Sequence, residues 1–166
     1  MQRIAQFEKV SAPQFAAAWH KTFGDTAEVP AETRLPRRAT AGSAGYDFFC
    51  PAAVRLGPGE TVCIPTGVRV RIDEGWVLKI YPRSGLGFKY RVQLNNTVGI
   101  IDSDYYFSDN EGHIFIKITN DSREGKTVEL AAGDGFAQGI FVEYGITVDD
   151  DATAVRNGGF GSTTGK

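Results

Sequence analysis

The chain has 166 residues, with 18 Lys and Arg against 20 Asp and Glu and a formal net charge of −2. This length supports one domain that buries roughly two thirds of its unfolded surface. The near-neutral charge argues against nucleic acid as the main partner, because proteins that bind duplexes usually present a strongly basic face. Cys50 and Cys63 are too few for a disulfide scaffold and too far apart for a C-x-x-C metal or redox site.

The N-terminal sequence MQRIAQFEKV lacks the apolar core of a signal peptide. No apolar run of the chain approaches the roughly 20 residues that a membrane-spanning helix needs. We therefore expect a soluble, cytoplasmic protein without a membrane partner. In that reducing compartment, the two cysteines are expected to be buried as small hydrophobic residues.

Residues 1–30 form a predicted N-terminal extension that contains one amphipathic helix. Ser11 is a candidate N-cap and Gly24 a candidate C-terminal stop. The aromatic residues Phe15, Trp19 and Phe23 are spaced four apart and would share one helical face.

Residues 31–151 are predicted to form a β core, with the clearest β pattern over residues 40–148. Apolar residues alternate in three segments, and turns rich in Gly, Pro or Asn recur every 8–15 residues. Many short strands of this kind indicate an all-β fold, a jelly-roll-like barrel or sandwich. The alternating residues are Val68, Val70 and Ile72, then Trp76, Leu78 and Ile80, then Ile114, Ile116 and Ile118.

Two polar clusters interrupt this pattern in its first half. In Ala44-Gly-Tyr-Asp47 the carboxylate follows a glycine turn, so Asp47 either caps that turn or belongs to a site. In Tyr81-Pro-Arg-Ser-Gly-Leu-Gly87 the proline ends a strand ladder, and Gly85 lets the backbone approach a ligand. Arg83 and Ser84 then offer a guanidinium fork and a hydroxyl to an anion.

The third cluster, residues 95–105, has the sequence NNTVGIIDSDY. Its Asn-Asn pair heads a predicted hairpin whose second arm is apolar until Asp102. A carboxylate that emerges there from a buried strand can hold a water molecule without full exposure. A purely structural strand-end aspartate is the alternative, and Asp104 fits that role better.

The fourth cluster, Gly133-Asp-Gly-Phe-Ala-Gln-Gly139, opens a short strand that carries the amide of Gln138. The final segment, residues 152–166, holds Arg156 and Phe160 among glycines and hydroxyl side chains and cannot enter a core. Its amides, hydroxyls and arginine can bind phosphate, and its aromatic ring can stack on a base. We interpret it as a mobile lid over a nucleotide polyphosphate; a plain flexible tail is the alternative.

Taken in order, these clusters resemble the five motifs of the trimeric dUTPase family: A-G-Y-D, P-R-S-G/S-L, G-x-I-D-x-x-Y, G-D-x-x-A-Q and R-x-G-G-F-G-S-T-G. All five occur here in the family's order, between Ala44 and Gly165. Three departures stand out. Gly135 replaces the usual arginine of the fourth motif, an extra threonine follows Ser162-Thr, and a longer loop over residues 106–112 follows the third motif. That loop is either a variation of a family branch or a partner surface, and the N-terminal helix lies outside the motifs.

The resemblance implies hydrolysis of dUTP to dUMP and pyrophosphate by attack of water on the α-phosphorus. Asp102 would activate that water, and Mg²⁺ would be carried largely by phosphates and waters, with Asp47 holding it through water. The remaining roles follow the motifs: Arg83, Ser84, Gly85 and Gln138 for phosphates, Asn96, Gly99, Ile100 and Ile101 for uracil, Tyr105 for deoxyribose, and Arg156, Phe160, Gly161 and Ser162 for the lid.

The resemblance also implies a homotrimer whose sites are shared. One chain would supply the first, second and fourth motifs, another the 96–105 segment, and the third the tail. Two alternatives remain open: a dCTP deaminase-like enzyme on a similar fold, and a non-catalytic regulator that binds a protein according to its nucleotide state. Turnover of dCTP would indicate the first, and nucleotide-dependent capture of a partner the second.

Overall fold

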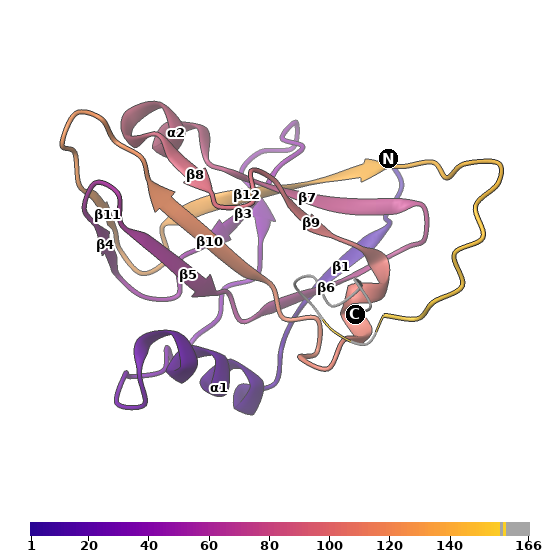
Figure 1. Cartoon of the computed structure of the whole chain (residues 1–166), viewed down its shortest axis with the longest axis horizontal. Coiled ribbons are helices and arrows are strands. Elements are labelled where there is room, and N and C mark those ends of the chain that lie inside the picture. Colours follow the sequence, from indigo (N-terminus) through magenta and orange to yellow (C-terminus); the bar gives the residue numbers. More distant parts are fainter. Residues whose placement is uncertain (157, 159–166) are drawn as a thin grey trace.

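The computed structural model describes residues 1–156 and 158 (Figure 1). Its N-terminal half contains β1 (Ala5–Lys9), α1 (Ala12–Phe23), β2 (Arg37–Arg38), β3 (Tyr46–Phe49), β4 (Val54–Leu56), β5 (Thr61–Pro65), β6 (Val68–Ile72), β7 (Trp76–Pro82) and α2 (Ser84–Tyr90). The remainder contains β8 (Val92–Leu94), β9 (Gly99–Ile101), the 3-10 helix η1 (Ser103–Phe107), β10 (Phe115–Asn120), β11 (Val128–Leu130) and β12 (Gly135–Glu143).

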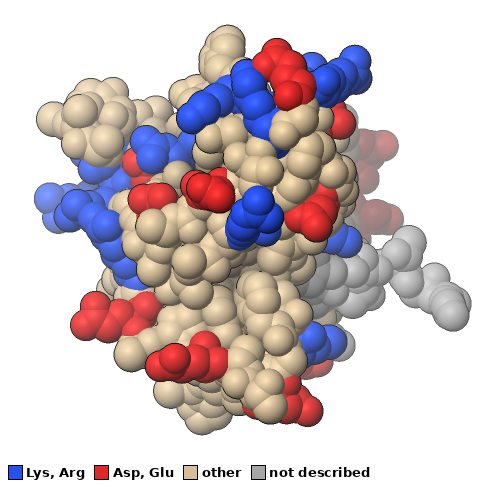
Figure 2. Space-filling model, turned by 90° about the vertical axis from the view of Figure 1, so that its left-hand side faces the viewer, with Lys and Arg blue, Asp and Glu red and all other residues tan. Residues whose placement is uncertain are grey.

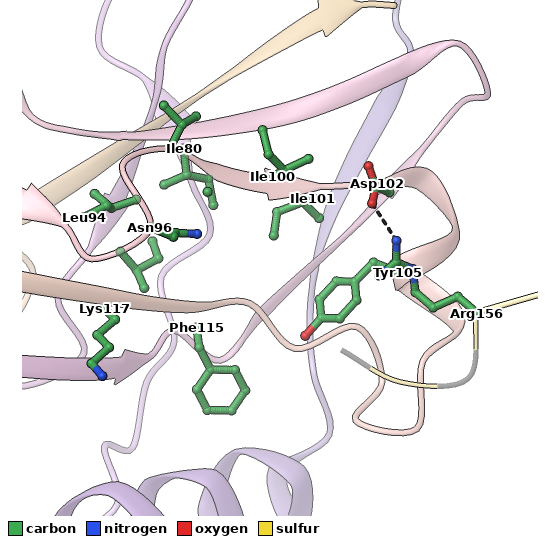
Figure 3. Close-up of a pocket in the computed structure, with 13 residues that line it drawn as sticks. Ile80, Leu94, Asn96, Ile100, Ile101, Asp102, Tyr105, Phe115, Lys117 and Arg156 are labelled. Atoms are coloured by element: carbon green, nitrogen blue, oxygen red, sulfur yellow. Dashed lines mark hydrogen bonds and ion pairs between the residues drawn. The ribbon is translucent and has the colours of Figure 1, made fainter. Parts of the chain in front are cut away.

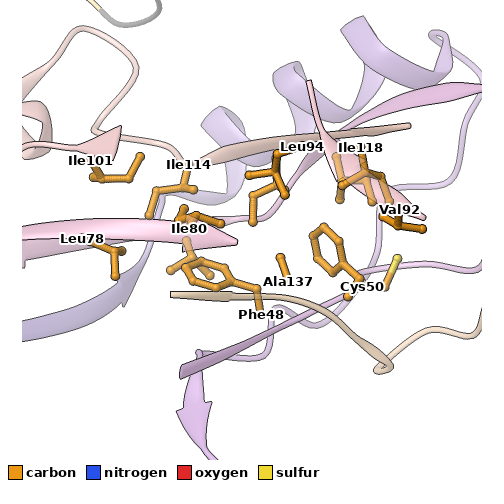
Figure 4. Packing of buried hydrophobic residues seen from close by; sticks show 14 of the residues in the cluster. Phe48, Cys50, Leu78, Ile80, Val92, Leu94, Ile101, Ile114, Ile118 and Ala137 are labelled. Atoms are coloured by element: carbon orange, nitrogen blue, oxygen red, sulfur yellow. The ribbon is translucent and has the colours of Figure 1, made fainter. Parts of the chain in front are cut away.

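The strands form antiparallel sheets. A five-stranded sheet has the order β2-β3-β12-β7-β9, a three-stranded sheet has the order β5-β10-β8, and β1-β6 and β11-β4 are separate pairs. The two larger sheets face each other across the main core, as Figure 4 shows for Leu78 and Ile80 on one side and Leu94 and Ile118 on the other. The predicted all-β, jelly-roll-like fold is therefore confirmed as a sandwich rather than a closed barrel.

Helix α1 lies outside this sandwich and packs on β5 (Figure 1). The Ser11 hydroxyl accepts the Gln14 N–H at 3.3 Å at its start, and the helix ends at Gly24, whose φ is 96°. Phe15 and Trp19 are buried in a small second core, whereas Phe23 lies at its exposed edge. The predicted amphipathic helix is thus confirmed.

The predicted hairpin at residues 95–101 is wrong. Strand β8 pairs with β10 and strand β9 with β7, so the two arms belong to different sheets. Between them Thr97 takes the left-handed region at φ 67° and donates its N–H to the Leu94 carbonyl at 3.0 Å. This turn carries the chain from one face of the core to the other, since both arms have buried residues to place there.

The second helix, α2, was not predicted, because Gly85 and Gly87 disfavour a helix. Packing outweighs that cost: Leu86 and Tyr90, four residues apart, both lie against the main core. The helix ends at Arg91, whose φ of 53° is left-handed.

Cys50 is buried in the main core, as expected, and burial raises the pKa of its thiol to about 11. Cys63 is only half-buried. Among the described residues, neither helix has the length and apolar content to cross a membrane. Figure 2 shows that acidic and basic side chains both occur on the face that it presents.

Candidate active site

A cavity of about 230 Å³ opens between β9 and β10 (Figure 3). It is mostly apolar, with a carboxylate and a guanidinium at one end. Its lining consists of Ile80, Leu94, Asn96, Val98, Gly99, Ile100, Ile101, Asp102, Tyr105, Phe115, Ile116, Lys117 and Arg156. The structure thus places Gly99, Ile101, Asp102 and Tyr105, the specified positions of the third motif, around one cavity.

Strand β9 forms one wall of this cavity and is an edge strand of the five-stranded sheet. One edge of its backbone pairs with β7, and the other edge is not paired to any strand in the described part of the chain. Gly99 allows close packing, because a Cβ there would lie 3.1 Å from the Ile80 Cβ. Backbone N–H and C=O groups of β9 are therefore available to a ligand with a flat polar edge.

Asp102 follows β9 directly and forms the N-terminal boundary of η1. Its side chain is 47% exposed, so the carboxylate stands at the rim of the cavity and not in the core. Arg156 donates from Nη2 to Asp102 Oδ2 at 2.6 Å (Figure 3). It also donates from Nε to Asp104 Oδ1 at 2.8 Å. The chain beyond β12 leaves the body in an extended arm and returns to this point (Figure 1).

Tyr105 is held with its ring against the cavity. The residue is buried, and its hydroxyl donates to the His113 carbonyl at 2.7 Å and accepts from Asn110 Nδ2 at 2.9 Å. Burial raises the pKa of the phenol, so the hydroxyl stays protonated at neutral pH and can donate. The plane of the ring is thus set by partners outside the third motif.

The first, second and fourth motifs meet at a different place. Gln138 is in register with Asp47 across β12 and β3, and Arg83 Nε lies 3.3 Å from Asp47 Oδ1. Arg83 also reaches the Gly135 carbonyl at 3.5 Å, and a Cβ at Gly135 would lie 2.6 Å from Arg83 Nη1. The glycine that departs from the family motif thus makes room for the guanidinium of Arg83.

Ser84 and Gly85 form the first turn of α2, next to this second cluster. Both are exposed or nearly so, and a Cβ at Gly85 would meet no atom within 4 Å. The first backbone N–H groups of a helix have no partner within the helix, so this turn can donate to an anion.

The two clusters lie at opposite ends of β7. Ile101 is opposite Leu78, and Asp102 continues away from the Pro82 end of the strand. Arg83 is five residues beyond Leu78 in the other direction, which is about 17 Å along an extended strand. Within one chain, the backbones of Asp102 and Arg83 are therefore well separated along the sheet.

The described residues contain no group of three or more His, Cys, Asp or Glu side chains that could enclose a metal. Asp47 has one guanidinium beside it and a side chain that is 18% exposed. This donor set fits Mg²⁺ only in the way that Mg²⁺ often binds nucleotides, through phosphates and waters with one or two protein carboxylates.

Three predicted site residues, Phe160, Gly161 and Ser162, lie outside the described residues. Conversely, Phe115 and Lys117 line the cavity and were not predicted. They are two apart on β10 and so share one face, but only the facing of β9 and β10 makes that face part of a site.

Two sequence comparisons find similar proteins. The family model described as dUTPase matches residues 31–164. The deoxyuridine 5'-triphosphate nucleotidohydrolase of Lactococcus lactis is 40% identical over 132 residues, which cover 78% of this chain and 87% of that protein.

Solved structures show the same fold. The crystal structure of dUTPase from Streptococcus mutans is 34% identical, with a TM-score of 0.65 and coverage of 87% of this chain and 98% of that one. A D95N mutant dUTPase from phage phi11 of S. aureus, in which a structural Mg(II) ion is coordinated, is 23% identical with a TM-score of 0.64 and covers 92% and 98%.

Proposed function

This chain belongs to the dUTPase family, and from that premise we propose that it hydrolyses dUTP to dUMP and pyrophosphate. The observation that carries the proposal is the cavity bounded by the free edge of β9, with Asp102 at its rim and Tyr105 in its wall. Each of these groups suits one part of the substrate.

The free backbone edge of β9 suits uracil. Uracil presents an acceptor at O4 and a donor at N3, which backbone N–H and C=O groups can pair with, whereas cytosine reverses this pattern. A cytosine would leave buried polar groups unpaired, at about 1–3 kcal/mol for each. Gly99, Ile100 and Ile101 would supply the backbone, with Asn96 at the turn before them.

Tyr105 suits the sugar. Its ring would pack beneath the deoxyribose and occupy the space that a 2′-hydroxyl needs. Asp102, three residues earlier, would hold the attacking water and accept its proton as the water attacks the α-phosphorus. Pyrophosphate then leaves with the bonding electron pair, and catalysis rests on positioning and on stabilisation of phosphoryl charge.

The second cluster suits the phosphates. Arg83, Ser84 and Gln138, with the N–H groups of the first turn of α2 near Gly85, would bind phosphate oxygens. Mg²⁺ bound to the phosphates would neutralise part of their charge, and Asp47 would hold one of its waters. The pairing of Arg83 with Asp47 keeps both side chains oriented before substrate binds.

Arg156 would bind the terminal phosphate when the tail closes, with Phe160 over the uracil and Gly161 and Ser162 on phosphate oxygens. In the described structure its guanidinium holds two carboxylates. A terminal phosphate can accept from both of these donors with two of its own oxygens and carries more charge than either carboxylate. Nucleotide binding would therefore draw Arg156 away from the two aspartates and release Asp102.

The separation of the two clusters favours a homotrimer with shared sites. Asp102 and Arg83 lie toward opposite ends of β7, whereas the proposed reaction uses both at one nucleotide. A closed three-fold ring would set the first, second and fourth motifs of one chain against the third motif of the next, with the tail of the third chain as lid.

The test is pyrophosphate release from dUTP, UTP and the other deoxynucleoside triphosphates by the wild-type protein and Asp102→Asn. The amide keeps the shape of the side chain but cannot take the proton, so we expect the chemical step to slow by about 10² or more. Binding of dUTP should change no more than a few-fold. Near-wild-type turnover by Asp102→Asn would remove Asp102 from this role, and release of ammonia from dCTP, measured in parallel, would indicate a deaminase-like enzyme.

A further inference from the structure

The loop at residues 106–113 and the N-terminal extension lie outside the family motifs, and residues 1–30 lie outside the matched family model. Both nevertheless reach Tyr105 through a continuous series of contacts. We infer that they form a brace that positions Tyr105, with Asn110 as the positioning residue that contacts it. This inference rests on the proposed role of Tyr105 in selecting the deoxyribose.

The inner part of the brace consists of the two bonds at the Tyr105 hydroxyl. Asn110 Nδ2 donates to it at 2.9 Å, and it donates to the His113 carbonyl at 2.7 Å. Asn110 is itself oriented, because its Oδ1 accepts the Gly112 N–H at 3.2 Å. With its hydroxyl bound on both the donor and acceptor side, the phenol ring has one favoured orientation.

The loop is also packed tightly against the residue that it holds. Gly112 has a φ of 69°, and a Cβ there would lie 2.8 Å from the Tyr105 carbonyl oxygen and 2.7 Å from the Tyr106 Cα. His113 is fully buried, and its Nε2 accepts the Gly67 N–H at 2.8 Å. The loop therefore cannot shift without carrying the backbone of Tyr105 with it.

The outer part of the brace fastens this loop to the N-terminal extension. Glu111 accepts from both the N–H and the hydroxyl of Ser11, at 2.7 and 2.6 Å, directly at the start of α1. These bonds lower the pKa of the Glu111 carboxyl. Glu111 adopts a left-handed φ of 60°, which a residue with a side chain adopts only when its surroundings hold it there.

A second fastening lies on strand β1. The Tyr106 hydroxyl donates to Glu8 Oε2 at 2.8 Å, and Arg69 both pairs with that carboxylate at 3.0 Å and lies over the Tyr106 ring at 4.4 Å. Strand β1 pairs with β6 along its whole length, so this anchor is part of the sheet framework. The residue after Tyr105 is thereby held from the other side.

The experiment measures kcat/KM for dUTP and for UTP in the wild type, Asn110→Ala, Tyr105→Phe and the double variant. Asn110→Ala removes one of the two hydrogen bonds at the Tyr105 hydroxyl, and Tyr105→Phe removes both. We expect each single variant to lower the ratio of kcat/KM for dUTP to that for UTP by about three- to tenfold, with the larger change in Tyr105→Phe. If Asn110 acts through the Tyr105 hydroxyl, the double variant should match Tyr105→Phe, since the hydroxyl that couples them is gone. If Asn110 had only a structural role, Asn110→Ala would lower kcat/KM for dUTP and for UTP by the same factor.

Glu111→Ala tests the outer fastening, with Glu124→Ala as control because Glu124 is an exposed loop glutamate paired only with Lys126 among the described residues. We expect Glu111→Ala to lower the ratio of kcat/KM for dUTP to that for UTP and to speed amide hydrogen exchange over residues 103–113. Glu124→Ala should change neither. An unchanged preference in Asn110→Ala and Glu111→Ala, or an effect of Asn110→Ala that adds to that of Tyr105→Phe, would overturn the brace.

The wild-type protein separates this inference from the proposed function. If it hydrolyses dUTP without preference over UTP, the role of Tyr105 in sugar selection fails, and amide exchange in Glu111→Ala then decides the brace alone. If the wild type prefers dUTP over UTP, and Asn110→Ala and Glu111→Ala keep that preference unchanged, the brace fails and the proposed function stands.

Discussion

At the scale of single residues, the site is built from side chains whose surroundings suit one task each. Asp102 is half exposed at the end of a buried strand, as its proposed role of holding a water molecule requires. Tyr105 is buried and bound at its hydroxyl, which fixes the ring for its proposed role of excluding a 2′-hydroxyl. His113 is buried and uncharged, and its carbonyl rather than its imidazole serves the site.

The buried histidine makes stability depend on pH. Burial lowers the pKa of His113 to about 4 from its ordinary 6.5. Between these values the unfolded chain binds a proton that the folded protein does not, so the free energy of unfolding falls as the pH falls. The total loss is about 3 kcal/mol by pH 4, of which roughly 2 kcal/mol should appear by pH 5. Chemical unfolding at pH 7 and pH 5 measures it.

The control is His113→Gln, whose amide oxygen can still accept the Gly67 N–H but takes no proton. This variant should show a nearly flat free energy of unfolding over the same interval. The pKa values of Glu8 and Glu111 are lowered from 4.5, so these carboxyls affect stability mainly near and below that pH and add little to the change between pH 7 and pH 5. An equally steep loss in His113→Gln would assign the pH dependence to another group.

At the scale of elements, the edge position of β9 and the loop after η1 decide what the cavity can do. The edge strand leaves backbone groups unpaired, which the proposed function assigns to the base, and the 106–113 loop packs behind Tyr105. A loop that sets a ring has to be tightly packed, and Gly112 is the point where that packing is closest.

Gly112→Ala should destabilise the protein more than Gly125→Ala. Both glycines have a φ near 70°, so both variants bear the same left-handed backbone cost of about 1–2 kcal/mol. Only at residue 112 does the added methyl group meet backbone atoms, at 2.7 and 2.8 Å, whereas residue 125 has open space. We expect a further loss of about 1–3 kcal/mol at residue 112, typical of overpacking, measured by urea unfolding. Equal losses of unfolding free energy in the two variants would mean that the 106–113 loop can move to accommodate the added methyl group.

At the scale of the whole molecule, the sheet itself separates the two halves of the site. Strand β7 carries Arg83 beyond its C-terminal end, and its partner β9 places Asp102 near the other end, one residue past the pairing of Ile101 with Leu78. A rigid sheet cannot fold back to unite them, which is why the shared-site trimer is part of the proposed function.

Mixed trimers test that assembly. Asp102→Asn and a chain truncated before Arg156 should each be nearly inactive alone. In a shared-site trimer, a site works when Asp102 comes from a truncated chain and the tail from an Asp102→Asn chain. Each condition has a chance of one half at equal mixing, so roughly a quarter of the sites should recover. Verified mixed trimers without recovery would contradict shared sites, and a monomer in solution would contradict the assembly.

The sequence by itself determined the fold class, the helix α1 and the segments that carry the site. Alternating apolar residues, capping residues and the five ordered motifs are local signals. Each can be recognised within a few neighbouring residues, without knowledge of the tertiary contacts. Asp102 at the end of a strand could be predicted because the apolar run before it ends there.

Only the tertiary structure decided how these segments meet. The arms expected to form a hairpin joined different sheets, because each had buried residues to place on its own side of the core. The contacts of Asn110 with Tyr105 and of Glu111 with Ser11 also lay beyond sequence reasoning, the latter across 100 residues. Long-range contacts such as these depend on packing in three dimensions, which no local pattern encodes.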